Sequence, residues 1–504
     1  MSLLGLDIGT SGCKAVIFDE EGRELSHCHE EYQLQFPDSE KCELNPREVW
    51  DAVFHVMDSA LSGMSVRDPI QAIGVSALAD AVTPLDINGN FLSNTIVGSS
   101  DRRAVRQADR IEKTIGRKEI FQATGVPVHS MYTVPKIMWL KENQPELYHN
   151  TWKFAGWPEI VQLKLGLDPK TDYSMASRSM GFNIKTKKWD PQLLNNCGID
   201  CEKLFSATRS CEIVGQFKDT PFSSHGMVKN PSIVAGGFDQ CCAALGVGIV
   251  SSGIGALTLG TCGVITSLSD QCVLNDPLLE GNHGLNCFVL DDKYASFGII
   301  VTAGSVLRWY RQELFSGIHD NTAAAMKDPY EHMINASPDT PSSIFVLPYF
   351  AGTGTPWLDP NQKGSIFGLT LNTGRLEILK GILDCICYEL KLNIESMRKA
   401  GLQIKSLRAI GGGAKSDKWL QLISDVVELP IDVTCVTEAG CLGAAFLAGL
   451  GSKIYSSYSD IEDLVETVKT FEPRNNISRR HDSSYQTYRE LTRRVEGLRV
   501  CPSL

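Results

Sequence analysis

The chain has 504 residues, which is too long for one compact hydrophobic core and predicts two large domains. Its formal net charge of −11 argues against nucleic acid or an anionic membrane as the main partner. No stretch approaches the roughly 18 uninterrupted apolar residues of a membrane helix. The sixteen cysteines mostly occupy apolar runs and lack the spacing of zinc pairs, so we expect reduced thiols and a cytoplasmic location.

Residues 3–19 predict a strand, a glycine turn over 9–12 and a second strand. A P-loop and a dinucleotide fingerprint are both excluded, because the required lysine spacing is missing and a strand, not a helix, follows the turn. Backbone N–H groups and hydroxyls of such a turn can still hold phosphate oxygens. The residues with this potential are Asp7 (for a hydrated Mg²⁺), Thr10, Ser11, Gly12 and Lys14. The alternative is an ordinary hairpin.

A helix is expected from Pro46, further strands lead to an Asn-Gly turn at 88–89, and helices dominate from about 101 to 165. Charged residues stand close to apolar strands at Asp80 and at Asp101, Arg102 and Arg103. Such paired donors and carboxylates suit polyhydroxylated ligands, whereas a surface ion pair explains Arg102 equally well. Residues 171–178, which end in an arginine, are interpreted as a structural turn.

The composition changes near Pro231, where residues 232–248 predict a strand, a glycine turn and a helix of small residues. Asp239 follows the glycines at the junction. A carboxylate in this position can accept a proton from a substrate hydroxyl, and it can equally be the N-cap of the helix.

Residues 253–268 predict a second glycine-punctuated hairpin with Gly260 and Thr261 at its turn, which hints at two related halves. Helices are expected over 303–315, about 377–399 and about 485–499, and a closely packing small-residue helix over 438–451. The turn over 411–419 opens another helix whose N-terminus could lie against a nucleotide. Each glycine turn alone is a weak signal, but together with the Asp239 turn they indicate a phosphate site.

The four turns, in this order, resemble the FGGY carbohydrate kinase family. Residues 131–143 are similar to its first signature and residues 364–384 to its second, with Gly381 where alanine or serine is usual. Residues 42–50 and 438–449 also look familial, and the resemblance covers about residues 3–450.

The resemblance implies an α/β fold of two actin-like (ribonuclease H-like) domains, as in the sugar kinase/hexokinase/actin superfamily, closing on an inter-domain cleft. The N-terminal domain, 1–247, would bind sugar and carry the first phosphate loop, and the C-terminal domain, 248–504, would bind ATP with Mg²⁺. Asp239 matches the family's catalytic base. Asp7 and Asp239 match its metal ligands. The sugar side is matched by Ala79, Asp80, Asp101, Arg103, Asp239 and Gln240. The nucleotide side is matched by Thr10, Ser11, Gly12, Lys14, Gly260, Thr261, Gly304, Arg308, Gly412, Gly413 and Asp417.

The sequence departs from the family pattern at positions that would contact the sugar. Ala79 stands where glycerol kinase carries a ligand-binding arginine, and Asp80 replaces the histidine of xylulokinase-like members. We therefore expect an ATP-dependent kinase acting on a terminal hydroxyl of a sugar, with a pentulose such as xylulose first and L-xylulose, gluconate or a polyol as alternatives. Other classes left open are an actin-type ATP switch and a sugar- or ATP-binding regulator without catalysis. The expected partner is a small-molecule sugar, with no nucleic acid or membrane, and a homodimer is the assembly left open.

Overall fold

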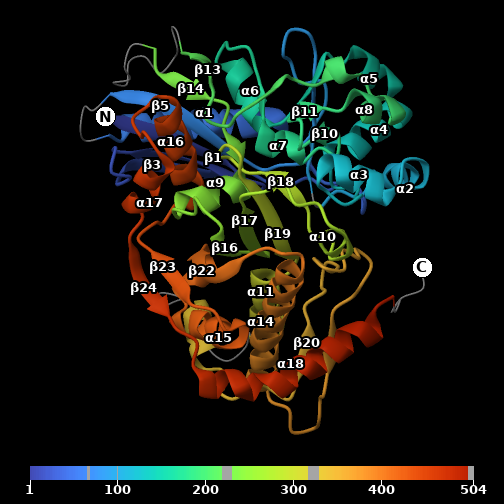
Figure 1. The fold of residues 1–504 in the computed structure, drawn as a ribbon, viewed down its shortest axis with the longest axis vertical. Helices are drawn as coiled ribbons and strands as arrows, with labels where there is room; N and C mark the ends of the chain where they lie inside the picture. The colour runs from blue at the N-terminus through green and yellow to red at the C-terminus, as the bar shows by residue number, and fades with distance from the viewer. Residues whose placement is uncertain (65–68, 99, 218–229, 316–328, 498–504) are drawn as a thin grey trace.

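The computed structural model describes residues 1–64, 69–98, 100–217, 230–315 and 329–497. Two mixed sheets follow one another along the long axis of the molecule, each covered by helices (Figure 1). Segments from the first half of the chain form most of the upper part of this view, and segments from the second half form the lower part. The predicted α/β class with two sheet-containing halves is confirmed.

The N-terminal sheet has the order β13-β14-β5-β1-β2-β3, and β15 also pairs with β5. Strands β1, β5 and β15 run parallel, with Asp7 opposite Ser76 and Ser76 opposite Gly237. Parallel strands end at the same edge of a sheet, so the first glycine turn and Asp239 lie at one edge. The strands are β1 (Ser2–Ile8), β2 (Gly12–Phe18), β3 (Glu24–Glu31), β5 (Ile70–Ala77), β13 (Ile213–Gln216), β14 (Ser232–Val234) and β15 (Gly237–Phe238).

The C-terminal sheet has the order β18-β19-β17-β16-β22-β23-β24. In both sheets an antiparallel three-stranded unit is followed by two parallel strands and an antiparallel edge strand, which agrees with the hint of two related halves. The strands are β16 (Gly253–Leu259), β17 (Gly263–Ser269), β18 (Leu285–Cys287), β19 (Tyr294–Ile300), β22 (Ile404–Ile410), β23 (Ile431–Thr434) and β24 (Thr467–Phe471).

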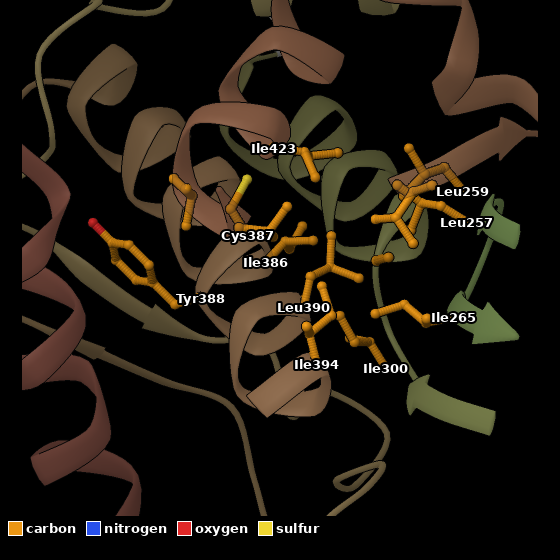
Figure 2. Close-up of a cluster of buried hydrophobic side chains, with 14 of the residues drawn as sticks. Leu257, Leu259, Ile265, Ile300, Ile386, Cys387, Tyr388, Leu390, Ile394 and Ile423 are labelled. Carbon is orange, nitrogen blue, oxygen red and sulfur yellow. The ribbon is translucent and has the colours of Figure 1, made fainter. Parts of the chain in front are cut away.

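Helices cover both sheets, and the sequence explains where several begin. Asn45 caps α1 (Pro46–Ser62), and Ser416 caps α15 (Asp417–Val427), each accepting a backbone N–H of the first turn. The long α14 (Arg375–Lys399) packs its Ile386, Leu390 and Ile394 toward strands β16, β17 and β19 (Figure 2). The main core of the C-terminal half is therefore the layer between α14 and this sheet.

The remaining elements are shorter or peripheral. The helices are α2 (Val105–Thr114), α3 (Arg117–Thr124), α4 (Thr133–Asn143), α5 (Pro145–Asn150), α6 (Trp157–Lys164), α7 (Tyr173–Ser177), α8 (Pro191–Asn196), α10 (Asp276–Glu280), α11 (Gly304–Tyr310), α13 (Pro329–Asn335), α17 (Tyr458–Leu464) and α18 (Asn475–Val495). The short paired strands are β4 (Glu43–Leu44), β6 (Thr83–Leu85), β7 (Thr95–Ile96), β8 (Lys153–Ala155), β9 (Thr171–Asp172), β10 (Phe182–Asn183), β11 (Lys188–Trp189), β12 (Ala207–Thr208), β20 (Phe345–Leu347) and β21 (Ser365–Phe367).

Two helices cross between the sheets. Although α16 (Ala439–Gly451) lies late in the chain, it packs on β1 and β5 of the N-terminal sheet, while α9 (Asp239–Gly246) packs against α16 and the C-terminal sheet (Figure 1). Glycines allow the approach: a Cβ on Gly5 would lie 1.8 Å from the carbonyl oxygen of Cys441, and one on Gly443 would lie 1.8 Å from that of Cys242. The small-residue pattern of 438–451 thus predicted its close packing correctly.

Two sequence-based expectations need correction. The last helix begins at Asn475 and not near 485, because Ser478 and His481 continue the buried face of Tyr485 and Tyr488 toward the N-terminus of the helix. It ends at Val495, and the last part of the expected helix, 498–499, lies outside the described residues. Residues 171–178 are not a turn but strand β9 followed by α7, which Asp172 caps. None of the helices in the described ranges combines the length and apolarity needed to cross a membrane.

Candidate active site

The first glycine turn is held closed by Tyr32. Its hydroxyl donates hydrogen bonds to the carbonyl oxygens of Gly9 (2.6 Å) and Gly12 (3.0 Å). Thr10 and Ser11, at the tip, are exposed. The backbone of the turn is thereby fixed while its hydroxyls stay accessible, as a phosphate-binding turn requires.

Asp7 lies at the end of β1, beside this turn. Its Oδ1 accepts a hydrogen bond of 2.6 Å from the buried Ser76 hydroxyl. Burial raises the pKa of Asp7, while the Ser76 hydrogen bond and the Lys14 charge act in the opposite direction. Lys14 forms an ion pair of 2.8 Å with Glu438, which precedes α16. The first phosphate turn is therefore tied to the C-terminal half of the chain.

Asp239 is the first residue of α9, and its Oδ1 is buried without a hydrogen-bond partner among the described residues. Burial, with the charge of Asp7, raises the pKa of Asp239 to about 7. The neighbouring Gln240 also has a buried Oε1 that lacks a partner within the described ranges. A carboxylate with one oxygen left without a partner among the described residues, and with a pKa near neutrality, suits a general base.

A pocket of about 350 Å³ lies between the second glycine turn and the start of α15. Arg308, Tyr330 and Trp419 contribute the largest side chains to its wall. The pocket brings together most of the residues predicted for nucleotide binding in the C-terminal half, namely Gly260, Thr261, Gly304, Arg308, Gly412 and Gly413.

Glycines bring the walls of this pocket close together. The Gly304 N–H donates to the carbonyl oxygen of Gly260 at 3.0 Å, and a Cβ on Gly304 would lie 2.5 Å from that oxygen. A Cβ on Gly413 would lie 2.7 Å from the Cβ of Leu259, whereas one on Gly412 would meet no heavy atom within 4 Å. Asp417 is not among the residues that line the pocket, and its carboxylate pairs with Lys469.

On the predicted sugar side, Asp80 is 8% exposed and has a φ of 62°, which is rare for a residue other than glycine. Arg178 donates to its Oδ2 at 2.6 Å. The guanidinium of Arg178 lies 5.0 Å from the ring centre of Tyr132 and 5.2 Å from that of Phe238, which directly precedes Asp239. Arg178 therefore links Asp80 to the position of the catalytic candidate.

Lys136 fixes the backbone of this region. It is fully buried, and its ammonium group donates to the carbonyl oxygens of Asp80 (2.6 Å) and Met131 (2.5 Å). Burial lowers the pKa of Lys136 to about 8. Ala79, next to Asp80, is 7% exposed.

Asp101 and Arg103, also predicted to bind sugar, belong to a buried ion-pair network. Arg103 donates to both Asp101 oxygens at 2.9–3.0 Å and to Glu43 at 2.7 Å. Asp101 also accepts the N–H of Cys42. The network holds β4 against the segment before α2, and its charges already satisfy one another, so a sugar contact from these residues stays a prediction.

The residues that could hold Mg²⁺ are Asp7 and Asp239. The described part of the chain contains no group of three or more His, Cys, Asp or Glu residues placed to bind a metal. Two carboxylates, one with an unsatisfied oxygen, fit an ion that keeps water ligands and binds mainly through phosphates.

Comparisons with known proteins identify the family of the chain. Models of the FGGY family of carbohydrate kinases match the chain over residues 2–246 for the N-terminal domain and 255–452 for the C-terminal domain. The chain belongs to this family. It is therefore a sugar kinase, as predicted.

Relatives and solved structures of FGGY kinases cover nearly the whole chain. A gluconokinase of Bacillus subtilis is 28% identical, with 98% of this chain and 96% of the relative covered, and a xylulose kinase of Staphylococcus xylosus is 27% identical, with 92% and 93% covered. The structure of ligand-bound xylulose kinase from Lactobacillus acidophilus has a TM-score of 0.89 at 24% identity and 99% coverage of both chains. These similarities confirm the predicted two-domain actin-like fold.

Sequence reasoning missed Arg178 and Ser76. Arg178 belongs to the segment interpreted as a turn, and nothing local indicates a pairing with Asp80, which lies 98 positions earlier. Ser76 meets Asp7 only through the register of two parallel strands. The available signal for Arg178 was a charged residue directly after an uncharged helical turn.

Proposed function

We propose that this FGGY kinase transfers the γ-phosphate of Mg-ATP to a terminal hydroxyl of a pentulose such as xylulose. The observation that carries the proposal is the buried Oδ1 of Asp239, which lacks a partner among the described residues and lies at the same sheet edge as the first glycine turn. A substrate hydroxyl would donate to this oxygen. Asp239 would take its proton as the hydroxyl oxygen attacks phosphorus.

The nucleotide would occupy the 350 Å³ pocket, with its base and ribose near Gly412 and Gly413 and its phosphates toward Thr261. Thr10, Ser11 and Lys14 would face the transferred phosphoryl group from the N-terminal half. Bound Mg²⁺, held through Asp7 and Asp239, would supply charge neutralisation for the phosphates. Binding between the halves would exclude water from the transfer.

Gluconate is the second candidate substrate, because a gluconokinase is among the relatives that cover almost all of the chain. L-xylulose and polyols are further candidates within the same chemistry. A regulator that binds sugar or ATP without turnover is disfavoured, because the chain keeps both Asp7 and Asp239.

The test of the catalytic role is Asp239→Asn. The amide cannot accept the proton, so we expect kcat to fall by about 10²–10⁴-fold while ATP affinity stays within a few-fold of the parent. ADP release measures turnover, and calorimetry measures nucleotide binding. Asp109→Asn, on the exposed face of α2, is the matched control. Turnover retained in Asp239→Asn would show that another group is the base.

The substrate is tested by ADP release over a panel of D-xylulose, L-xylulose, ribulose, polyols, gluconate and glycerol. The proposal predicts the highest kcat/KM for a pentulose. A higher value for gluconate or glycerol would replace the proposed substrate, while the absence of sugar-stimulated ADP release with any member would favour a regulator.

A further inference from the structure

Unsatisfied hydrogen-bonding atoms around Arg178 describe the ligand that the sugar side can accept. Counting only the described residues, the buried atoms without a partner include Oδ1 of Asp80, Oδ1 of Asp239 and Oε1 of Gln240 as acceptors, and Nε of Arg178 as a donor. Arg178 joins them, because it pairs with Asp80 and its guanidinium lies beside the ring of Phe238, next to Asp239. Acceptors therefore outnumber donors.

A ligand that satisfies this set must donate more hydrogen bonds than it accepts. Hydroxyl groups do so, because each carries a proton that it can turn toward a carboxylate or amide oxygen. The carboxylate of a sugar acid has no proton to donate, so a buried acceptor that faces it would stay unpaired, which is costly.

The charges favour the same ligand. Asp80, Asp239 and Asp7 bring three carboxylates to this region. Of the cations that act on them, Arg178 already pairs with Asp80 and Lys14 already pairs with Glu438. The ammonium of Lys136 is engaged by two carbonyl oxygens. A sugar acid would add a negative charge where like charges are already buried, and like-charge contacts oppose binding strongly.

We infer that Asp80 is a specificity residue that admits uncharged polyhydroxyl substrates and rejects sugar acids. The inference rests on the proposed function, since it assigns Asp80 to the sugar side of that site. Asp80 is set for this task by neighbours from three separate segments of the chain. Arg178 holds Oδ2, Lys136 holds the main-chain carbonyl, and Gly98 leaves room, because a Cβ there would lie 2.9 Å from the Cβ of Asp80.

Matched pairs of ligands test the inference. Xylitol and xylonate, and likewise glucitol and gluconate, have the same chain and differ at C1 as a hydroxymethyl group or a carboxylate. Calorimetry without nucleotide gives their affinities, and ADP release gives kcat/KM. We expect the alcohol of at least one pair to bind at least tenfold more tightly than its acid. Equal binding within both pairs, tighter binding of the acids, or no binding of either pair overturns the inference.

The substitution Asp80→Asn removes the charge and keeps the shape. We expect the alcohol-to-acid ratio of affinities to fall by about tenfold or more, and that of Asp109→Asn to match the parent. An unchanged ratio in a folded Asp80→Asn protein overturns the role of Asp80. Because calorimetry reads the ratio without phosphoryl transfer, a protein that discriminates but never releases ADP would refute the kinase proposal and leave this inference standing.

Discussion

At the scale of single residues, Lys136 has an unusual position. A fully buried lysine must be paired or hydrogen-bonded to be tolerated, and here the partners are two main-chain carbonyl oxygens instead of a carboxylate. One of them belongs to Asp80, whose positive φ costs roughly 1–3 kcal/mol and needs support from its surroundings. Lys136 supplies this support, and any effect it has on sugar binding is transmitted through Asp80.

We therefore expect Lys136→Met to raise the KM for the sugar about tenfold while the KM for ATP changes less than twofold. Methionine keeps the length of the side chain but cannot donate to the carbonyl oxygens, so the Asp80 backbone loses its fixed conformation. Steady-state ADP release with each substrate varied in turn separates the two constants. A parallel rise in both KM values would mean that Lys136 has only a general structural role.

Gly412 and Gly413 are adjacent in the chain, but a side chain added to each would meet different surroundings. We expect Gly413→Val to lower the unfolding temperature, because its Cβ would press on Leu259 and Trp419, and Gly412→Val to leave it unchanged, because that Cβ meets open space. Gly412→Val should still weaken ATP binding, since the residue lines the pocket. Thermal denaturation and nucleotide titration check the two effects. Equal unfolding temperatures for the two variants would contradict the packing argument.

Residues read correctly from the sequence share a local signature, and those that were missed do not. Gly260, Thr261 and Gly412 stand where apolar strands end in glycine turns, so their strand-end positions were predictable from a few neighbours. Ser76 and Arg178 act across strands and helices far apart in the chain, and no local pattern carries that information. The turn that contains Asp417 was predicted correctly. Its ion pair with Lys469 was not predictable, because that pair depends on where β24 is placed.

At the scale of elements, α18 is anchored to α14 by a buried carboxylate. Glu389 of α14 accepts hydrogen bonds from the hydroxyls of Tyr349 (2.7 Å) and Tyr488, which belongs to α18. Burial raises the pKa of Glu389 from 4.5 to about 7, although both hydroxyls act in the opposite direction. The C-terminal helix, at the bottom of Figure 1, is thus attached through a group that gains a proton near neutral pH.

The sign of the resulting pH effect follows from proton linkage. The folded state binds the Glu389 proton more tightly than the unfolded state does, so its contribution to stability is complete below pH 4.5 and is lost as the pH rises through about 7. We expect Glu389→Gln to flatten the fall of the unfolding temperature over this interval. Thermal denaturation at several pH values measures the difference between parent and variant. Parallel curves would show that Glu389 does not titrate in this range.

At the scale of the whole molecule, the crossing of α9 and α16 joins the two halves. We expect Gly443→Ala to lower both the free energy of unfolding and kcat. The new Cβ on α16 would lie 1.8 Å from the carbonyl oxygen of Cys242, so α9, which begins with Asp239, would have to move away from α16. Overpacking of this kind costs roughly 1–3 kcal/mol or more. Gly374→Ala, with no heavy atom within 4 Å of the new Cβ, is the control for unfolding temperature and ADP release. Identical behaviour of the two variants would contradict the tight crossing.

The packing of α16 on the sheet of the other half also sets an order of events during synthesis. Strands β1 and β5 are made long before the helix that covers their glycines, because most of the C-terminal sheet lies between them in the sequence. At roughly 5–20 residues per second, the nascent N-terminal sheet must wait on the order of tens of seconds for that cover. The first half is therefore completed only after most of the second half has been made, even though its own strands are made first.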